Sequence, residues 1–200
     1  MKQVVLATGN PGKLKEMAEI LQPFGWGVSP QSDFFADEAE ETGLSFIENA
    51  ILKARFACLK TGLPAIADDS GLEVAALQGR PGIYSARYAG PNASDEANLQ
   101  RLLVDMEGVP PKQRQASYYC AMVFCRYADD PTPLVGLGRW KGEILQAPQG
   151  DGGFGYDPIF WVPQLEKSAA QLSKQQKNAM SHRAQALKGL VAQIRCDLEG

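Results

Sequence analysis

The chain has 200 residues, of which 44% are hydrophobic, and a formal net charge of −3. A chain of this size can bury a sizeable core, and no repeat or linker divides it, so we expect a single domain over residues 1–200. The slight acidic excess argues against non-specific nucleic-acid binding, and no apolar stretch approaches the ~20 residues needed to cross a bilayer. We therefore expect a cytoplasmic protein that binds neither nucleic acid nor membranes.

The cysteines and the histidine give no sign of metal or disulfide chemistry. Cys58, Cys120, Cys125 and Cys196 form no CxxC pair, and His182 is the only histidine of the chain. Four scattered cysteines in a chain of this length are typical of reduced core residues.

The first predicted elements are a strand at residues 3–8, a turn at residues 9–13 and a helix over residues 14–21. Asn10 suits the helix cap and Pro11 the first helical position. A strand, a turn and a helix N-terminus together direct backbone N–H groups and a positive dipole end at one point, which favours an anion-binding site. The alternative is an ordinary turn between a strand and a helix.

An acidic loop and a capped helix follow. Residues 31–43 lack clean periodicity and predict a loop whose acids are mostly solvated. Ser45, with Glu48 three residues later, is typical of a helix N-terminus with a capping box. Asn49 and Lys53 lie four residues apart and share one face of this helix. Taken by itself, the helix favours solvated side chains at both positions.

Residues 63–67 form an apolar run that ends at two adjacent carboxylates, Asp68 and Asp69, followed by Ser70 and Gly71. The run predicts a buried strand with the polar residues at its carboxyl end, where ligands bind in open α/β sheets. Neighbouring carboxylates repel each other unless a cation, a proton or basic groups compensate. The pair is therefore either a metal site or part of an Asp-Ser-Gly turn.

The next segments predict a framework for the site. They are a loop at residues 81–90 that lines a cleft or a subunit interface, a helix at 94–106, a hairpin of strands at 116–127 and 134–140, and a short strand at 143–146.

Residues 150–158 carry four glycines around two aromatic residues, so the backbone there can approach a ligand closely. A flat base could stack on Phe154, with Tyr156 and Asp157 offering polar edges. The alternative is a hairpin or mobile loop with Phe154 in the core.

A helical region is predicted at residues 173–198, with a Ser-x-x-Gln start at Ser173. Lys177, His182 and Arg183 lie toward its amino-terminal part, and a histidine followed by an arginine is commonly a pair of surface residues.

The separate signals fit one chemistry. Polyphosphate requires cations, a metal requires carboxylates, and a base requires a stacking surface. An anion-binding turn, several lysines, paired acids and a glycine-aromatic loop together indicate a nucleoside triphosphate site.

The same segments resemble a known family. Residues 8–13, 41–43, 48–50, 53–54, 67–72, 81–87, 152–158 and 181–183 are similar in order and spacing to the inosine/xanthosine triphosphate pyrophosphatases, the dITP/XTP house-cleaning hydrolases. The resemblance implies an α/β protein, elongated and two-lobed around a long mixed β-sheet, with a nucleotide cleft between the lobes. It also implies a homodimer, a requirement for Mg²⁺, and cleavage of purine nucleoside triphosphates (ITP, dITP, XTP) to the monophosphate and pyrophosphate.

Onto that reaction we place the candidate residues as a hypothesis. Asp69 is the catalytic residue, which orients or deprotonates the attacking water, and Glu41 and Asp69 are the magnesium ligands. Asp68 either supports a ligand or binds magnesium through water. The substrate-binding candidates are Thr8, Gly9, Asn10, Pro11, Gly12, Lys13, Lys53, Ser70, Phe154, Gly155, Tyr156, Asp157, Lys177, His182 and Arg183.

Among these, Lys13, Lys53 and Lys177 are expected to neutralise the triphosphate. Phe154 is expected to stack on the purine. Arg183 and His182 would donate to the 6-oxo group, and Asp157 would accept from the ring N1–H. Adenine leaves these groups unpaired and is rejected, whereas preference over guanine comes only from the family resemblance.

Two other functions fit part of this pattern. A nucleotide-binding module without catalysis would need the lysines but has little use for both Glu41 and Asp69. A phosphohydrolase acting on another triphosphate, such as a modified pyrimidine nucleotide, would share the phosphate-binding residues.

Overall fold

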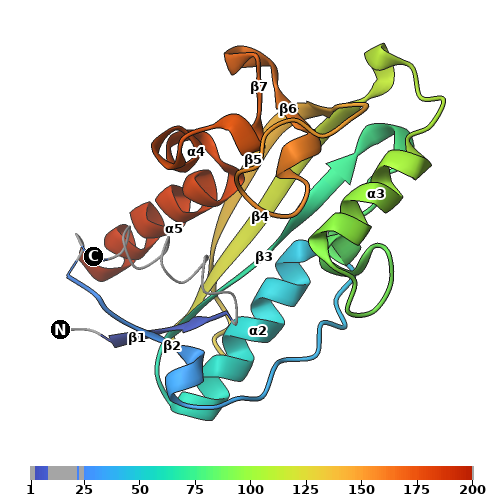
Figure 1. Cartoon of the computed structure of the whole chain (residues 1–200). Coiled ribbons are helices and arrows are strands. Elements are labelled where there is room, and N and C mark those ends of the chain that lie inside the picture. The colour runs from blue at the N-terminus through green and yellow to red at the C-terminus, as the bar shows by residue number, and fades with distance from the viewer. Residues whose placement is uncertain (1–2, 9–21, 23–24, 200) are drawn as a thin grey trace. The chain divides into compact units, whose positions relative to one another are not determined.

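The fold is a mixed α/β arrangement, seen in a computed structural model that describes residues 3–8, 22 and 25–199 (Figure 1). In these ranges a seven-stranded sheet has the order β2-β1-β3-β4-β5-β6-β7. β1 pairs in parallel with β2 and β3, whereas β5–β6 and β6–β7 are antiparallel. The predicted α/β class with a mixed sheet is therefore confirmed.

The helices and strands are β1 (Gln3–Ala7), β2 (Gly27–Pro30), α2 (Phe46–Thr61), β3 (Ala65–Val74), α3 (Asp95–Asp105), β4 (Gln115–Cys125), β5 (Leu134–Ile144), β6 (Phe160–Val162), β7 (Lys167–Ser168), α4 (Lys174–Met180) and α5 (His182–Glu199). The turn predicted at residues 9–13 and the helix predicted at 14–21 lie outside the described residues.

The chain divides into two compact units. The first contains residues 1–69, 120–137 and 185–200, and the second contains 70–119 and 138–184. The expectations of a single domain and of a two-lobed molecule with a nucleotide cleft stay predictions.

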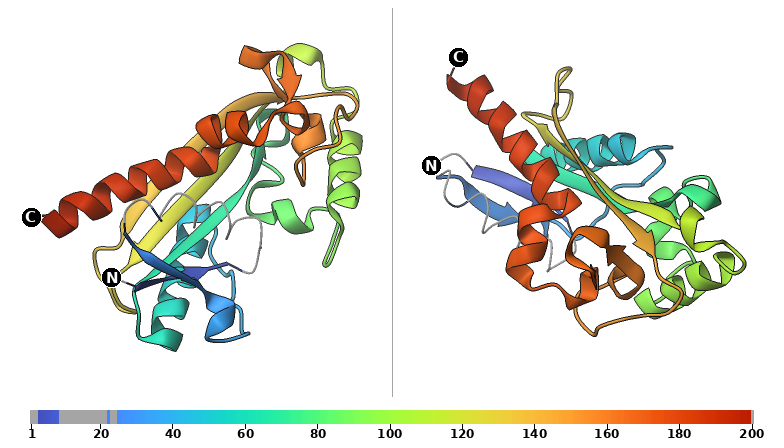
Figure 2. Two further views of the ribbon diagram at one scale, coloured as in Figure 1. Left: turned by 60° about the vertical axis from the view of Figure 1, so that its left-hand side comes forward. Right: turned by 90° about the horizontal axis from the view of Figure 1, so that it is seen from above.

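The core of the first unit forms where α5 packs on the sheet. Residues 4–7 of β1 are all buried, as expected of a parallel strand covered on both faces. Leu187, Leu190 and Ile194 recur at helical spacing on α5 and pack with Val4 and other side chains of β1, β3 and β4. α2 contacts β1, and α2 and α5 lie on different sides of the strands (Figure 2).

The second unit has its own core. Leu72 and Val74 alternate along the later part of β3, and Leu99 and Leu102 of α3 pack with them, together with Trp140 of β5. Ser94 caps α3, accepting a hydrogen bond from the backbone N–H three residues later, as its sequence predicts.

β3 is longer than the sequence predicts. We expected the strand to end before Asp68, but it continues to Val74, so both that end and the alternative of an Asp-Ser-Gly turn are wrong. The last β1–β3 pair joins Ala7 to Ala67, and beyond it β4 still flanks β3 on the other side, which keeps the backbone extended. The two acids therefore lie within a strand, just past the carboxyl end of β1.

Other predicted elements are confirmed with changed boundaries. The hairpin of β4 and β5 forms, and β5 runs on to Ile144, so no separate strand begins at residue 143. The C-terminal helical region is interrupted at Ser181, whose extended backbone separates α4 from α5. Residues 82–87 form a short 3-10 helix. The strands β2, β6 and β7 are not predicted by the sequence.

Most cysteines lie in the protein interior. Cys58, Cys120 and Cys125 are buried, which confirms them as core residues, whereas Cys196 is exposed, so the prediction that it lies in the core is wrong. In the part of the chain that the structure describes, no helix combines the length and apolar character required to cross a membrane.

Candidate active site

The first group of predicted site residues gathers in the first unit around Lys53 of α2. We call it the acid–lysine cluster, and it consists of Glu41, Asn49, Lys53, Asp68 and Asp69. The Lys53 Nζ lies 2.9 Å from the Glu41 Oε1 and 3.0 Å from the Asp69 Oδ1. One ammonium group therefore links the end of the acidic loop to β3.

The electrostatics of the cluster keep Lys53 charged. Burial by itself lowers the pKa of the Lys53 ammonium, but the negative charges of Asp69, Asp68 and Glu41 outweigh it and raise this pKa above its ordinary value. The lysine thus compensates the adjacent carboxylates that the sequence marked as needing a cation.

Asn49 is the most buried member of this cluster. Its side chain has 0% relative exposure, its Oδ1 accepts a hydrogen bond from the Gly43 N–H at 2.8 Å, and its Nδ2 donates to the Asp69 Oδ2 at 3.4 Å. The prediction that Asn49 and Lys53 are solvated is wrong, because β3 and the acidic loop cover this face of α2. Asn49 orients one carboxylate oxygen of Asp69, while Lys53 binds the other.

Gly43 allows this contact. A Cβ atom at Gly43 would lie 2.6 Å from the Glu48 Cβ and 2.7 Å from the Asn49 Oδ1, closer than atoms can approach without a shift. The glycine therefore lets the loop that carries Glu41 lie against the start of α2.

The start of α2 follows the capping signal. The Ser45 side chain accepts a hydrogen bond from the Glu48 N–H, and the Glu48 carboxylate accepts from the Leu44 N–H at 2.9 Å. The predicted N-cap is confirmed. The Glu48 carboxylate binds the Leu44 N–H, whereas in a capping box it would bind the N–H of the cap residue itself, Ser45.

The donor set of the acid–lysine cluster fits magnesium. Carboxylate oxygens are the protein ligands that Mg²⁺ prefers, and it commonly uses one or two of them together with waters and substrate phosphates. Glu41 and Asp69 supply such a pair, held within hydrogen-bond distance of one nitrogen. Among the described residues no group of three or more histidine, cysteine or acidic side chains is arranged as a metal centre, so the metal assignment stays a prediction.

The second group of predicted site residues gathers in the second unit. We call it the aromatic–cation cluster, and it consists of Phe154, Asp157, Lys177, His182 and Arg183. The Phe154 ring is 48% exposed, with the Lys177 Nζ 4.7 Å and the Arg183 guanidinium carbon 5.2 Å from its centroid. The alternative of a Phe154 in the core is therefore wrong.

Asp157 holds the glycine-aromatic loop together. Its buried carboxylate accepts a hydrogen bond from the Phe154 N–H at 3.0 Å and one from the Tyr118 hydroxyl at 3.3 Å, and it pairs with the Lys177 ammonium. Gly153 has a positive φ, and a Cβ there would collide with the Asp157 side chain. Both carboxylate oxygens of Asp157 therefore contact groups of the protein, and base recognition by Asp157 stays a prediction.

His182 and Arg183 are not the surface pair that their sequence suggests. His182 is 3% exposed, and its ring is stacked on Tyr118 with centroids 4.8 Å apart and planes 9° apart. The Arg183 Nη2 donates to the Ser70 Oγ at 3.3 Å. Two predicted residues from distant parts of the chain, Ser70 and Arg183, are therefore brought together.

The loop that carries Phe154 is also supported by residues outside the predicted site. The Gly155 N–H donates to the Asp95 carboxylate at 2.8 Å, and the Tyr156 hydroxyl donates to the Ser85 carbonyl at 2.7 Å. Ser85 lies in the segment that we expected to line a cleft or a subunit interface, and here it supports Tyr156. Asp95 and Tyr118 carried no signal of a functional role in the sequence.

The remaining predicted residues are placed as follows. Lys177, expected to bind phosphate like Lys53, contacts Asp157 and Phe154, and its role stays a prediction. Thr8 follows β1, and its N–H donates to the Leu6 carbonyl at 3.0 Å. Gly9, Asn10, Pro11, Gly12 and Lys13 lie outside the described residues.

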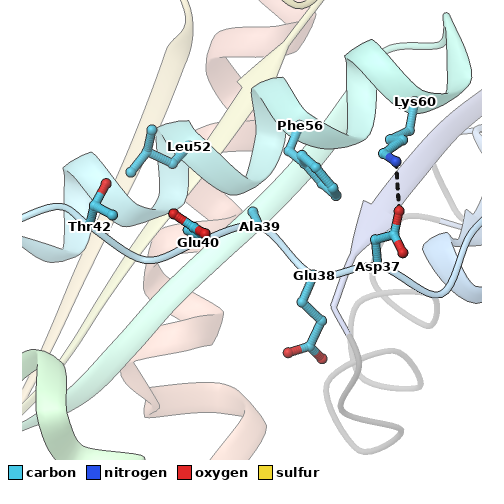
Figure 3. Close-up of a pocket in the computed structure, with 8 residues that line it drawn as sticks. All are labelled: Asp37, Glu38, Ala39, Glu40, Thr42, Leu52, Phe56 and Lys60. Carbon is cyan, nitrogen blue, oxygen red and sulfur yellow. Dashed lines mark hydrogen bonds and ion pairs between the residues drawn. The ribbon is translucent and has the colours of Figure 1, made fainter.

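A groove of about 560 Å³ lies between the acidic loop and α2 (Figure 3). Its lining residues are Asp37, Glu38, Ala39, Glu40, Thr42, Leu52, Phe56 and Lys60. None of them is a predicted site residue, so the groove is distinct from both clusters.

Comparisons with known proteins agree on one family. A family model described as the Ham1 family matches residues 4–193. Proteins named dITP/XTP pyrophosphatase from Pectobacterium atrosepticum and Escherichia coli are each 58% identical over 195 residues, which is 98% of this chain and 99% of theirs. The solved structure of a HAM1 protein from Coxiella burnetii has a TM-score of 0.93 and 48% identity, and the match covers 98% of this chain and 99% of that one. The chain, whose motif residues form the two clusters above, therefore belongs to the Ham1 family.

Proposed function

We propose that this protein hydrolyses noncanonical purine nucleoside triphosphates, namely ITP, dITP and XTP, to the monophosphate and pyrophosphate. The observation that carries the proposal is the acid–lysine cluster, in which two carboxylates share one lysine. The substrate class is supported by the relatives that are named dITP/XTP pyrophosphatase.

In this proposal, Asp69 activates the water. One oxygen of its carboxylate is bound by Asn49 and the other by Lys53, so the group is held in a fixed orientation. The water oxygen attacks one phosphorus of the α–β anhydride, its proton passes to Asp69, and the bond from that phosphorus to the bridging oxygen breaks, which releases the monophosphate and pyrophosphate. Lys53 stabilises the negative charge that develops on the phosphate oxygens.

Glu41 and Asp69 would hold magnesium, which when bound neutralises phosphate charge and orients the polyphosphate. The protein supplies the rest of the positive charge through its lysines. We include Lys13 among these phosphate-binding lysines on the basis of the sequence alone.

Base selection is assigned to the aromatic–cation cluster. The exposed ring of Phe154 offers a stacking face for a purine, and the Arg183 guanidinium next to it offers donors for a 6-oxo group. Adenine carries a 6-amino donor instead, so it would leave the guanidinium donors unpaired. The His182 ring is buried, so we assign His182 a role in base selection through the side chains that it contacts and not through direct contact with the base.

A homodimer and a cytoplasmic location complete the proposal. Both follow from the family resemblance and from a substrate that belongs to the nucleotide pool. Sedimentation of the untagged chain tests the first.

The proposal is tested by assaying ITP, XTP, dITP, GTP, ATP and a modified pyrimidine triphosphate with Mg²⁺, measuring pyrophosphate and orthophosphate separately. We expect pyrophosphate release, with ITP and XTP preferred over ATP. Asp69→Asn should lower turnover by about 10²–10⁴-fold, because the proton acceptor is lost. Asp129→Asn, an exposed acid in the β4–β5 turn, is the matched control and should keep wild-type turnover.

Each alternative function gives a different result. Orthophosphate release, or a preference for the pyrimidine nucleotide, would contradict the proposed substrate and reaction. Tight binding without turnover would identify a nucleotide-binding module, and unchanged turnover in Asp69→Asn would remove Asp69 from its role.

A further inference from the structure

Tyr118 lies beneath the aromatic–cation cluster without a role in the proposed function. It projects from β4, is 8% exposed, and belongs to the core of the second unit. Its ring and its hydroxyl contact two different members of the cluster.

The ring contacts His182. The two rings are parallel within 9°, with centroids 4.8 Å apart, so they form an offset stack in which part of the imidazole face lies on the tyrosine. His182 begins α5 and is followed directly by Arg183. The stack therefore fixes the residue that precedes the guanidinium assigned to the 6-oxo group.

The hydroxyl contacts Asp157. The Tyr118 Oη donates to the Asp157 Oδ1 at 3.3 Å, and the Asp157 Oδ2 accepts from the Phe154 N–H at 3.0 Å. Burial, together with the charge of Asp157, raises the pKa of the Tyr118 hydroxyl, so it remains a protonated donor. Tyr118 therefore also supports the loop that presents Phe154.

Two further aromatic rings of the core pack near Tyr118. The Phe160 ring of β6 lies 4.6 Å and the Trp140 ring of β5 lies 6.1 Å from the Tyr118 ring, between centroids. Packed aromatic rings have few alternative positions, because the surrounding core leaves no room for them to turn. The sheet therefore holds Tyr118 in one position, and Tyr118 in turn holds His182 and Asp157 in place.

We propose that Tyr118 is a specificity-determining positioning residue, whose ring acts as a platform under His182 and thereby aligns Arg183 and Phe154 for base recognition. It touches no substrate, and it acts through His182 and Asp157. The proposal rests on the proposed function, since it concerns how that function selects its base.

The test compares Tyr118→Leu, which removes the ring, with Tyr118→Phe, which removes only the hydroxyl. We expect Tyr118→Leu to lower the ratio of kcat/KM for ITP to that for ATP by about tenfold, mainly by raising the KM for ITP, because misplaced donors weaken discrimination. Tyr118→Phe should change the ratio by no more than about threefold, since it loses one long hydrogen bond. Tyr127→Leu replaces a tyrosine that is 50% exposed and should leave the ratio unchanged.

A second readout needs no substrate. His182 is the only histidine of the chain, so the imidazole proton signals in the NMR spectrum of the untagged protein belong to it alone. A ring stacked on Tyr118 shifts these signals upfield. The shift should persist in Tyr118→Phe and disappear in Tyr118→Leu, even if the latter variant is less stable.

The outcomes separate this inference from the proposed function. If the wild type does not prefer ITP to ATP, the proposed substrate class is wrong. If the wild type prefers ITP and Tyr118→Leu keeps that preference within about twofold, the role of Tyr118 is overturned, whether or not the histidine signals move.

Discussion

At the scale of single residues, close contacts determine how the acid–lysine cluster is built. Gly43 donates its N–H to Asn49, and Asn49 donates to Asp69. The contact exists only because Gly43 has no side chain. The position of Glu41 at the end of the acidic loop therefore depends on a glycine two residues away.

Gly43→Ala should lower both activity and stability. The added methyl would meet the Glu48 Cβ at 2.6 Å and force the loop away from α2, breaking the hydrogen bond to a fully buried amide. A buried polar group left without its partner costs about 1–3 kcal/mol. Urea unfolding and pyrophosphate release measure the two effects.

Gly189→Ala is the matched control. Gly189 lies inside α5, and an added Cβ there meets nothing within 4 Å. The substitution should raise the free energy of unfolding by about 0.5–1 kcal/mol, because alanine loses less backbone entropy in a helix. If Gly43→Ala were as stable and active as this control, the close-approach argument would be refuted.

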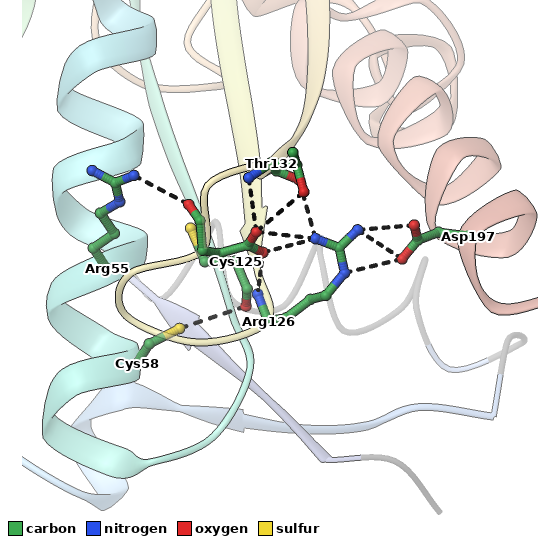
Figure 4. Close-up of polar contacts among 7 residues, drawn as sticks. Arg55, Cys58, Cys125, Arg126, Thr132 and Asp197 are labelled. Carbon is green, nitrogen blue, oxygen red and sulfur yellow. Dashed lines mark hydrogen bonds and ion pairs between the residues drawn. The ribbon is translucent and has the colours of Figure 1, made fainter.

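At the scale of elements, a charged clamp joins α5 to the β4–β5 turn in the first unit (Figure 4). The Arg126 guanidinium binds Asp197 of α5 at 2.8 Å and Asp130 of the turn at 2.9 Å. Asp130 has a fully buried side chain and also accepts from the backbone N–H groups of Arg126 and Thr132. The clamp therefore contains one buried and one half-exposed acid.

The two acids should contribute unequally to stability. Arg126→Ala leaves the buried Asp130 carboxylate without its cation, and breaking such a pair costs about 3–5 kcal/mol. Asp197→Ala removes a half-exposed partner, which is worth about 0–1 kcal/mol. Denaturant midpoints of both variants measure the difference, and equal losses would show that the burial of Asp130 does not matter.

The pKa of Asp130 predicts how stability depends on pH. Burial raises this pKa, but hydrogen bonds from Arg126 and Thr132 outweigh it, and the result lies below the ordinary value. A carboxyl whose pKa is lower in the folded state stabilises the fold above its unfolded pKa, about 4, and loses that contribution as the pH falls through the folded pKa.

In Asp130→Asn this loss is absent. The variant should be less stable at pH 7, and its unfolding free energy should change less than that of the wild type between about pH 5 and pH 3. Parallel pH profiles of the two proteins would assign the acid sensitivity to other groups.

At the scale of the whole molecule, the fold should not require magnesium. Lys53 already compensates Glu41 and Asp69, so removing the metal leaves no unbalanced pair of carboxylates. We expect EDTA to abolish pyrophosphate release, with recovery on adding Mg²⁺, while the thermal unfolding midpoint changes little. Unfolding in EDTA would mean that the metal, and not Lys53, holds the cluster together.

Much of the fold is local enough to be predicted from sequence. The caps at Ser45, Ser94 and Ser173 each depend on contacts three residues apart, and all three are confirmed. The helix break at Ser181 was missed because no proline or glycine marks it. The short strands β2, β6 and β7 were missed because their few residues carry no alternation long enough to detect.

The sequence by itself determined the α/β class, the capped helices and, through its motifs, the family. Only the tertiary structure decided which polar residues are buried and which contacts they make. Asn49 and Asp69 lie 20 residues apart and Tyr118 and Asp157 lie 39 apart. Caps and helical periodicity depend on neighbours within one or two turns, whereas burial depends on segments that meet only after the chain has folded. For this reason Asp68 and Asp69 could be identified from the sequence as needing a cation, and the structure was required to show Lys53 beside them.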